Sequence, residues 1–210
     1  RGSSTSRGLG DVYKRQSDIP VIVVGNLTIG GTGKTPLVKY IATELQKLGY
    51  KPGLVSRGYG GKFKQTLKVD ENTSVKQTGD EAQILSKLNL PFYIDINRVR
   101  ALKTIAANHD CDIIISDDGL QHYNMNRDVE ILVIDGKRRF GNNLLFPAGP
   151  LRESKKRIKS VDFIVNNSGP TQEDEYLMNI SRSKFAHLKS GKSYPVEKWP
   201  VHKQVHAVAG

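Results

Sequence analysis

The fold is decided by the stretch PVIVVGNLTIGGTGKT, which runs from Pro20 to Thr35. It opens with a continuous apolar run, typical of a β-strand that is buried on both faces. A glycine-rich segment follows, and apolar residues then recur at helical spacing from Lys34 to Leu48, with Gly49 at the stop position. This order of strand, glycine-rich loop and helix predicts the first unit of an α/β fold.

The rest of the chain repeats this alternation. Helical patterns cover residues 80–88 and 98–108, and short apolar runs predict strands at residues 52–56, 90–94, 112–116, 130–135 and 161–166. The fold class that we expect is therefore α/β, a P-loop NTPase-like, mostly parallel sheet flanked by helices. We expect residues 17–168 to form this core domain, and residues 169–210 to form a linker and the truncated start of a smaller second domain.

The two ends of the chain differ from this core. Residues 1–16 are polar, aperiodic and rich in glycine and serine, so we interpret them as a foreign, adaptor-derived segment. The final stretch, VHKQVHAVAG, has an alternating apolar pattern and predicts the start of a strand near Val205. We therefore expect a fragment that lacks both of its natural ends.

The composition is that of a basic globular protein. Lys and Arg number 32 against 21 Asp and Glu, which gives a formal net charge of +11. This charge favours nucleic acid, an anionic membrane surface or a phosphorylated substrate as partner. Nucleic acid ranks last, because aromatic residues are not interleaved with the basic ones. The one cysteine, Cys111, excludes an internal disulfide, and no apolar run reaches the roughly 18 residues of a membrane-spanning helix.

The glycine-rich segment has the composition and position of a phosphate-binding loop. In such a loop, backbone N–H groups and the helix N-terminus favour phosphate oxygens, a lysine reaches the β- and γ-phosphates, and a threonine hydroxyl binds Mg²⁺. Thr28 stands where the standard motif has its first glycine. The alternative is a tight turn that binds no ligand. The candidate nucleotide-binding residues are Thr28, Gly30, Gly31, Thr32, Gly33, Lys34 and Thr35.

A second motif, DIIISDDG, places Asp117 and Asp118 directly after an apolar run. Open α/β sheets bind ligands at the carboxyl ends of their strands, so one carboxylate is the natural partner of a Mg²⁺ ion held by Thr35. Side chains alternate along a strand, so the two carboxylates point to different sides and serve different roles. The alternative is that they form a turn or a helix N-cap.

Three further segments contain candidate polar residues. The loop SRGYGG either offers Arg57 to phosphate oxygens or is a plain flexible loop. In TGDE, Asp80 is either a helix N-cap or a general base that deprotonates an acceptor hydroxyl. Arg152 and Glu153 end the segment GPLRE and are candidates for function, whereas the lysines after them fit a solvated helix face.

These motifs follow one another in an order that is specific to one family. The chain closely resembles the tetraacyldisaccharide 4'-kinases over residues 19–168, and faintly up to residue 210, through VVGNLTIGGTGKTP, SRGYGG, TGDE, SDDGLQH, DGKRRFGN and LLFPAGPLRE. The resemblance implies a kinase that transfers the γ-phosphate of ATP, with Mg²⁺, to the 4'-hydroxyl of tetraacyldisaccharide 1-phosphate in lipid A biosynthesis. It also implies a location at the cytoplasmic face of the bacterial inner membrane.

The resemblance assigns roles to individual residues. Lys34 and Thr35 match the phosphate loop, Arg57 joins the nucleotide-binding set, and Thr35 and Asp117 are assigned to the metal, although which of the paired carboxylates binds it stays open. Asp80 matches the family's catalytic base. Arg98 or Arg100 matches a further basic contact. The residues assigned to catalysis are Asp80, Asp118, Arg152 and Glu153.

The resemblance also predicts what surrounds the site. The family has an N-terminal membrane-anchoring helix and a C-terminal part that supplies an active-site histidine, which His202 and His206 do not match. The expected partners are the acylated glucosamine disaccharide lipid and, peripherally, an anionic membrane, with no nucleic acid and no obligate protein partner. Two other functions stay open from the residues: a P-loop kinase for a soluble metabolite, and a nucleotide switch or partitioning ATPase.

Overall fold

The computed structural model describes residues 18–181, 184–186 and 190–195. The predicted foreign segment and the predicted strand near Val205 lie outside these residues. The chain divides into two compact units, Arg1–Met178 and Asn179–Gly210.

The smaller unit contains an antiparallel hairpin of β9 (Lys184–Ala186) and β10 (Ser193–Pro195). The larger unit contains all the motifs discussed above. In the part of the chain that the structure describes, no helix has both the length and the apolar character needed to cross a membrane.

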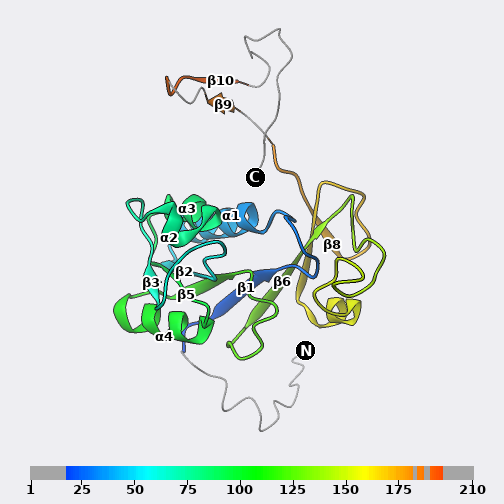
Figure 1. Cartoon of the computed structure of the whole chain (residues 1–210), viewed down its shortest axis with the longest axis horizontal. Coiled ribbons are helices and arrows are strands. Elements are labelled where there is room, and N and C mark those ends of the chain that lie inside the picture. The colour runs from blue at the N-terminus through cyan, green and yellow to red at the C-terminus, as the bar shows by residue number, and fades with distance from the viewer. Residues whose placement is uncertain (1–17, 182–183, 187–189, 196–210) are drawn as a thin grey trace. The chain divides into compact units, whose positions relative to one another are not determined.

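An eight-stranded sheet forms the centre of the larger unit (Figure 1). Its strand order is β3-β4-β2-β5-β1-β6-β7-β8, and every neighbouring pair is parallel except β3 and β4. The chain winds outward from the central β1 in both directions, so a ligand crevice is expected at the carboxyl end of β1. The strands are β1 (Val21–Gly25), β2 (Pro52–Ser56), β3 (Leu67–Lys68), β4 (Phe92–Ile94), β5 (Ile113–Asp117), β6 (Val129–Asp135), β7 (Phe163–Asn167) and β8 (Glu175–Met178).

Helices cover both faces of this sheet (Figure 1). On one face lie α1 (Lys34–Lys47), α2 (Val75–Thr78) and α3 (Asp80–Ser86), and on the other lies α4 (Arg98–Asn108). A 3₁₀ segment, η1 (Lys155–Ser160), precedes β7.

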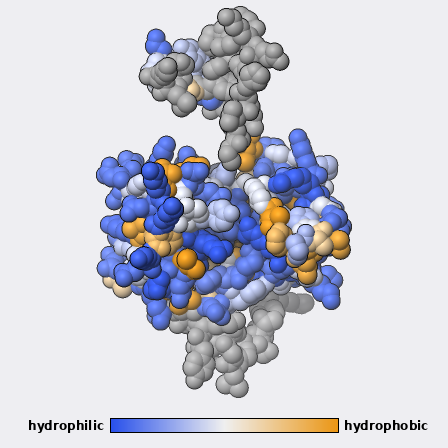
Figure 2. Space-filling model, in the orientation of Figure 1, coloured by the Kyte–Doolittle hydropathy of each residue, from blue (hydrophilic) through white to orange (hydrophobic). Residues whose placement is uncertain are grey.

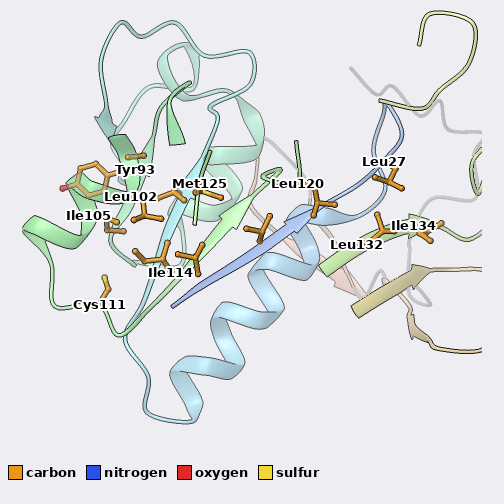
Figure 3. Packing of buried hydrophobic residues seen from close by; sticks show 14 of the residues in the cluster. Leu27, Tyr93, Leu102, Ile105, Cys111, Ile114, Leu120, Met125, Leu132 and Ile134 are labelled. Carbon is orange, nitrogen blue, oxygen red and sulfur yellow. The ribbon is translucent and has the colours of Figure 1, made fainter. Parts of the chain in front are cut away.

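Each face has its own apolar core. Under α4, Leu102 and Ile105 pack with Ile114 of the central strands, as Figure 3 shows. Under α1 and α3, Val38 and Leu85 pack with the opposite face of the same strands. The central strands are buried on both faces, which explains their continuous apolar runs.

The structure confirms the predicted α/β class, and every predicted strand and helix of the core is present with ends shifted by at most two residues. From the sequence we expect the core to end at residue 168, whereas β8 pairs in parallel with β7 and carries the larger unit to Met178. Glu175, whose side chain is 3% exposed, ties this strand to the sheet by accepting two hydrogen bonds from Arg139, at 2.7 and 2.9 Å. Residues 168–174, which resemble a linker in sequence, therefore connect two neighbouring strands of the same sheet.

Candidate active site

The predicted phosphate loop connects β1 to α1 at the carboxyl edge of the sheet, and Asn26 shapes its first half. The buried Asn26 amide donates to the carbonyls of Thr28 at 2.7 Å and of Gly30 at 3.3 Å. Its Oδ1 accepts a hydrogen bond from Lys34 Nζ at 3.2 Å. Asn26 therefore braces the loop from inside.

Two side chains from neighbouring strands hold the second half of the loop. Arg138, which follows β6, donates to the carbonyl of Gly31 at 2.6 Å, and Asn167, the last residue of β7, donates to the carbonyl of Thr32 at 3.0 Å. In a trans peptide the carbonyl and the following N–H point in opposite directions. The N–H groups of Thr32 and Gly33, which follow these carbonyls, are thereby turned away from the two donors, as phosphate binding requires. We call Asn26, Arg138 and Asn167 the loop clamp.

Gly33, the N-cap of α1, is where the loop most clearly needs glycine. Its φ of 94° lies in the left-handed region, and a Cβ there would come within 2.6 Å of the side-chain nitrogen of Asn167. Both constraints exclude a side chain without strain. The glycine that the motif predicts is thus required by the clamp as well as by close approach of a ligand.

Lys34 and Thr35 are buried in the first turn of α1. The Lys34 ammonium lies 3.5 Å from Asp118 Oδ1 in addition to its hydrogen bond with Asn26. A buried ammonium is costly without partners, and these two oxygens supply them. Lys34 is therefore held at the loop in the position that the sequence predicts for a phosphate-binding lysine.

The environment of Asp117 disfavours its charge. Its side chain is buried, and neither carboxylate oxygen accepts a hydrogen bond within the described residues. Burial, followed by the negative charge of Glu81, raises the pKa of Asp117 to about 7. Glu81, from the start of α3, was not identified from the sequence.

Asp118 has the opposite character. It accepts hydrogen bonds from Arg152 at 2.9 and 3.0 Å and pairs with Lys34. Burial by itself would raise the pKa of Asp118, but the charges of Lys34 and Arg152 hold it below the usual value. The two carboxylates thus lie in different environments, as we expect from the sequence, but the cause is the end of β5 at Asp117 and the left-handed backbone of Asp118, whose φ is 53°.

Arg152 reaches the site because the GPLRE segment pairs with the chain just before the phosphate loop. The N–H of Arg152 donates to the carbonyl of Leu27 at 2.7 Å, and the N–H of Ile29 donates to the carbonyl of Pro150 at 2.8 Å. An antiparallel bridge between Thr28 and Leu151 lies between these bonds. We call this pairing of residues 27–29 with residues 150–152 the short ribbon.

Glu153 lies one step further from the loop. It accepts a hydrogen bond from Gln121 Nε2 at 2.7 Å and another from the hydroxyl of Tyr123. Gln121 also donates to the carbonyl of Asn26 at 3.0 Å, so it connects Glu153 to the loop clamp. Asn26 and Gln121 stand inside the motifs quoted above, but nothing in their residue type distinguished them.

A cavity of about 410 Å³ opens beside Asp118 and is lined by the arginines Arg57, Arg98 and Arg152 together with His122. The buried Arg98 guanidinium donates to the carbonyl of Asp95 at 2.6 Å, and burial lowers the pKa of Arg98 to about 10. Of the two arginines that the sequence left undecided, the structure thus brings Arg98 to the site.

Arg100 instead forms an ion pair with the carboxylate of Asp95, at 2.6 and 2.8 Å, and is absent from the cavity lining. Because it lies two residues beyond the buried position of Arg98, over half a helical turn away, it faces away from the core on α4.

Asp80 is exposed at the first position of α3. The N-cap of α3 is Gly79, so the interpretation of Asp80 as the capping residue is wrong. A Cβ on Gly79 would come within 2.0 Å of the carbonyl oxygen of Tyr59, so the TGDE and SRGYGG segments pack against each other. Asp80 forms no hydrogen bond or ion pair with the Lys34–Asp118–Arg152 cluster.

The family model described as tetraacyldisaccharide-1-P 4'-kinase matches residues 5–210 of the chain. The chain belongs to this family. The match begins inside the segment that we interpret as foreign, and that interpretation stays a prediction.

Curated tetraacyldisaccharide 4'-kinases are similar over most of the chain. That of Shewanella frigidimarina is 51% identical over 163 residues, covering 77% of this chain and 49% of the relative. That of Vibrio campbellii is 46% identical over 193 residues, covering 91% and 57%. The chain therefore spans about half the length of the curated relatives that it matches.

A crystal structure of LpxK from Aquifex aeolicus in complex with ATP has a related fold. Its TM-score with this chain is 0.72 at 30% sequence identity, and the match covers 87% of this chain and 60% of that one. Family and fold thus agree with the resemblance seen in the sequence.

Proposed function

We propose that this chain functions as a tetraacyldisaccharide 4'-kinase, which transfers the γ-phosphate of ATP to the 4'-hydroxyl of tetraacyldisaccharide 1-phosphate in lipid A biosynthesis. The observation that carries the proposal is the meeting of Lys34 and Arg152 on the carboxylate of Asp118. One cation comes from a clamped phosphate loop, and the other from a distant segment. Phosphoryl transfer is catalysed mainly by such positioned charges around the transferring group.

The surroundings of Asp117 fit a Mg²⁺ ion. Its two buried carboxylate oxygens accept no hydrogen bond within the described residues, and a cation would supply the missing partner. The hydroxyl of Thr35 offers a second oxygen ligand, and phosphate oxygens and water would complete the octahedral shell that Mg²⁺ prefers. When bound, the ion would neutralise negative charge on the phosphates.

The remaining residues have roles in holding ATP and the acceptor. The loop residues Thr28 to Thr35 and Arg57 bind the nucleotide, while Arg98 and Arg152 place positive charge in the cavity beside it. Asp118 keeps Lys34 and Arg152 in place until phosphate oxygens replace it. Asp80 accepts the proton of the acceptor hydroxyl, and Glu153 orients the polar side chains near Arg152.

The lipid acceptor determines which partners the protein contacts. An acylated glucosamine disaccharide resides in a membrane, so the protein works as a peripheral protein at an anionic bilayer, at the cytoplasmic face of the inner membrane where ATP is available. The net charge of +11 supports contact with anionic lipid headgroups. The proposal includes no nucleic-acid partner and no obligate protein partner.

The test is label transfer from γ-labelled ATP to tetraacyldisaccharide 1-phosphate by a protein extended to the length of its relatives. We expect Lys34→Ala to reduce the rate more than about tenfold, because about 1.4 kcal/mol or more of transition-state stabilisation is lost. Lys39→Ala, at an exposed lysine of the same helix, is the matched control and should keep the rate. Release of free phosphate without labelled lipid would support a nucleotide switch and overturn the proposal.

A further inference from the structure

The segment between β6 and η1 exposes three consecutive apolar side chains. Leu144, Leu145 and Phe146 are 51%, 52% and 65% exposed. Figure 2 shows apolar side chains gathered on the side of the larger unit that carries this yellow-green segment in Figure 1. Consecutive exposed apolar residues are unfavourable in water and are typical of a contact surface. We call residues 142–149 the apolar loop.

The apolar loop is closed by hydrogen bonds within it and by hydrogen bonds to Leu151 of the short ribbon. The Asn142 amide donates to the carbonyl of Ala148 at 2.9 Å. Backbone bonds close the rest of the loop: Leu151 N–H to the Leu144 carbonyl at 3.1 Å, Phe146 N–H to the Leu151 carbonyl at 2.7 Å, and Gly149 N–H to the Leu145 carbonyl at 3.0 Å. Polar backbone groups that pair within the loop can leave water at little cost, as insertion among lipids requires.

Basic residues flank the apolar loop on both sides. Between residues 137 and 159 the sequence has eight Lys and Arg and one acidic residue, Glu153. Lys155 contacts the loop directly, because its Nζ donates to Asn143 Oδ1 at 2.9 Å. Lys137 and Lys156 are exposed. Apolar side chains bordered by lysines match the interface of an anionic bilayer, where each basic residue near the surface contributes about 1 kcal/mol.

The apolar loop is also attached to the carboxyl edge of the sheet, where the candidate site lies. It runs directly into the short ribbon, whose hydrogen bonds join residues 150–152 to residues 27–29 at the start of the phosphate loop. The side chain that follows, Arg152, binds Asp118 in the candidate site. A bilayer that binds the apolar loop would therefore also fix the position of the candidate site relative to the membrane.

We propose that Leu144, Leu145 and Phe146 insert into the headgroup region of an anionic lipid bilayer and so bring the carboxyl edge of the sheet, with the candidate site, to the membrane surface. The lipid acceptor in this inference rests on the proposed function, but the bilayer contact itself is measured without catalysis.

The first experiment measures binding of the chain to vesicles of phosphatidylcholine with and without phosphatidylglycerol. L145S/F146S should weaken binding to the anionic vesicles about tenfold, since two half-exposed apolar side chains lose their burial in lipid. The matched control is L48S/Y50S, which removes residues that are 73% and 49% exposed at the far end of α1. It should bind as the parent does. Equal binding by L145S/F146S and the control would overturn the inference.

A second experiment reports on the loop itself. Trp199, the one tryptophan of the chain, is replaced by Phe, and Phe146→Trp supplies a probe whose emission should shift to the blue and be quenched by brominated lipids when vesicles are added. Emission that is already blue-shifted without vesicles would mean that protein covers the loop, either another segment or a second copy. That result would overturn the inference, and sedimentation would distinguish the two coverings.

Binding of a fluorescent ATP analogue to the same variants separates this inference from the proposed function. ATP binding with no loop-dependent vesicle binding would refute the membrane contact alone. Loop-dependent vesicle binding without ATP binding would refute the kinase and leave the contact standing.

Discussion

Asp117 and Asp118 are adjacent, yet their environments shift their pKa values in opposite directions. Burial beside Glu81 raises the pKa of Asp117 to about 7, whereas the charges of Lys34 and Arg152 outweigh burial and lower that of Asp118. At neutral pH the folded protein without a cation thus disfavours the ionised form of Asp117. Asp117 is therefore suited to a site that binds a cation.

Asp117→Asn should therefore stabilise the protein in the absence of nucleotide and metal. The folded pKa is raised above the ordinary 3.8, so the cost of burying the charge grows as the pH rises from about 4 to about 7. We expect the stability advantage of the variant over the parent to grow by about 2 kcal/mol between about pH 5 and pH 8. Urea denaturation at both pH values measures it. A constant difference would contradict the assigned environment, and loss of Mg²⁺-dependent turnover in the variant would support the metal role.

Asp80→Asn tests the proposed base. Gly79 caps α3, so the substitution removes only a charge in the first helical turn and should cost less than about 1 kcal/mol of stability. An amide cannot take the acceptor's proton, so the rate should fall about 10²-fold or more with unchanged ATP affinity. Label transfer and thermal denaturation together provide the measurement. Transfer at the parental rate would exclude Asp80 as the base.

At the scale of the element, the loop clamp depends on strands that are remote in the sequence. Arg138 and its acceptor Gly31 are 107 residues apart, and Asn167 and its acceptor Thr32 are 135 apart. The phosphate loop has its shape because β6 and β7 end beside it. A loop with Thr28 in place of the standard first glycine is thus stabilised by donors from outside the motif.

Arg138→Ala should loosen this loop. The guanidinium donates to the Gly31 carbonyl from an exposed position, so we expect ATP affinity to fall about tenfold, less than a fully buried charged hydrogen bond would cost. Lys137→Ala, at the preceding exposed residue, is the control and should bind ATP normally. Titration with a fluorescent ATP analogue gives both values. Equal affinities would show that the Arg138 contact does not position the loop.

The loop clamp also shows where prediction from sequence stops. Apolar periodicity predicted the core strands and helices because burial imposes it, and the phosphate loop followed from its glycines. The short β3 and α2 bury too few residues to leave a pattern. Asn26, Gln121 and Glu81 act through contacts that only the folded chain creates. Arg98 and Arg100 are equal in residue type, and only their places on α4 separate them.

At the scale of the whole molecule, β8 decides how far the larger unit extends. It forms the edge of the sheet and is tied to β7 and to the segment after β6 through Glu175. Hydrogen bonds from Arg139 lower the pKa of Glu175 to about 2. A carboxylate with a depressed pKa stabilises the fold above the unfolded pKa, and this contribution is lost as the pH falls through the folded value.

Glu175→Gln should therefore destabilise the larger unit in a pH-dependent way. We expect a loss of about 2 kcal/mol at pH 7, which shrinks as the pH falls from 4.5, where Glu175 of the unfolded parent protonates, towards about 2, where the folded carboxylate protonates. Glu173→Gln, at an exposed position two residues earlier, is the control and should change stability little. Denaturant titrations at both pH values measure the effect. A loss that is independent of pH would mean that packing, and not the ion pair, holds β8.

The short ribbon limits which length changes this protein tolerates. Surface loops usually accept insertions and deletions, but residues 150–152 pair with residues 27–29 in a fixed register. Deleting one residue from the apolar loop would draw the strand along by one position and turn every side chain to the opposite face. Arg152 would leave Asp118, and Glu153 would take its place beside a carboxylate of like charge, which would repel it. The length of the apolar loop is thus as tightly restricted by geometry as that of the phosphate loop, although the apolar loop is exposed and lies far from the phosphate loop in the sequence.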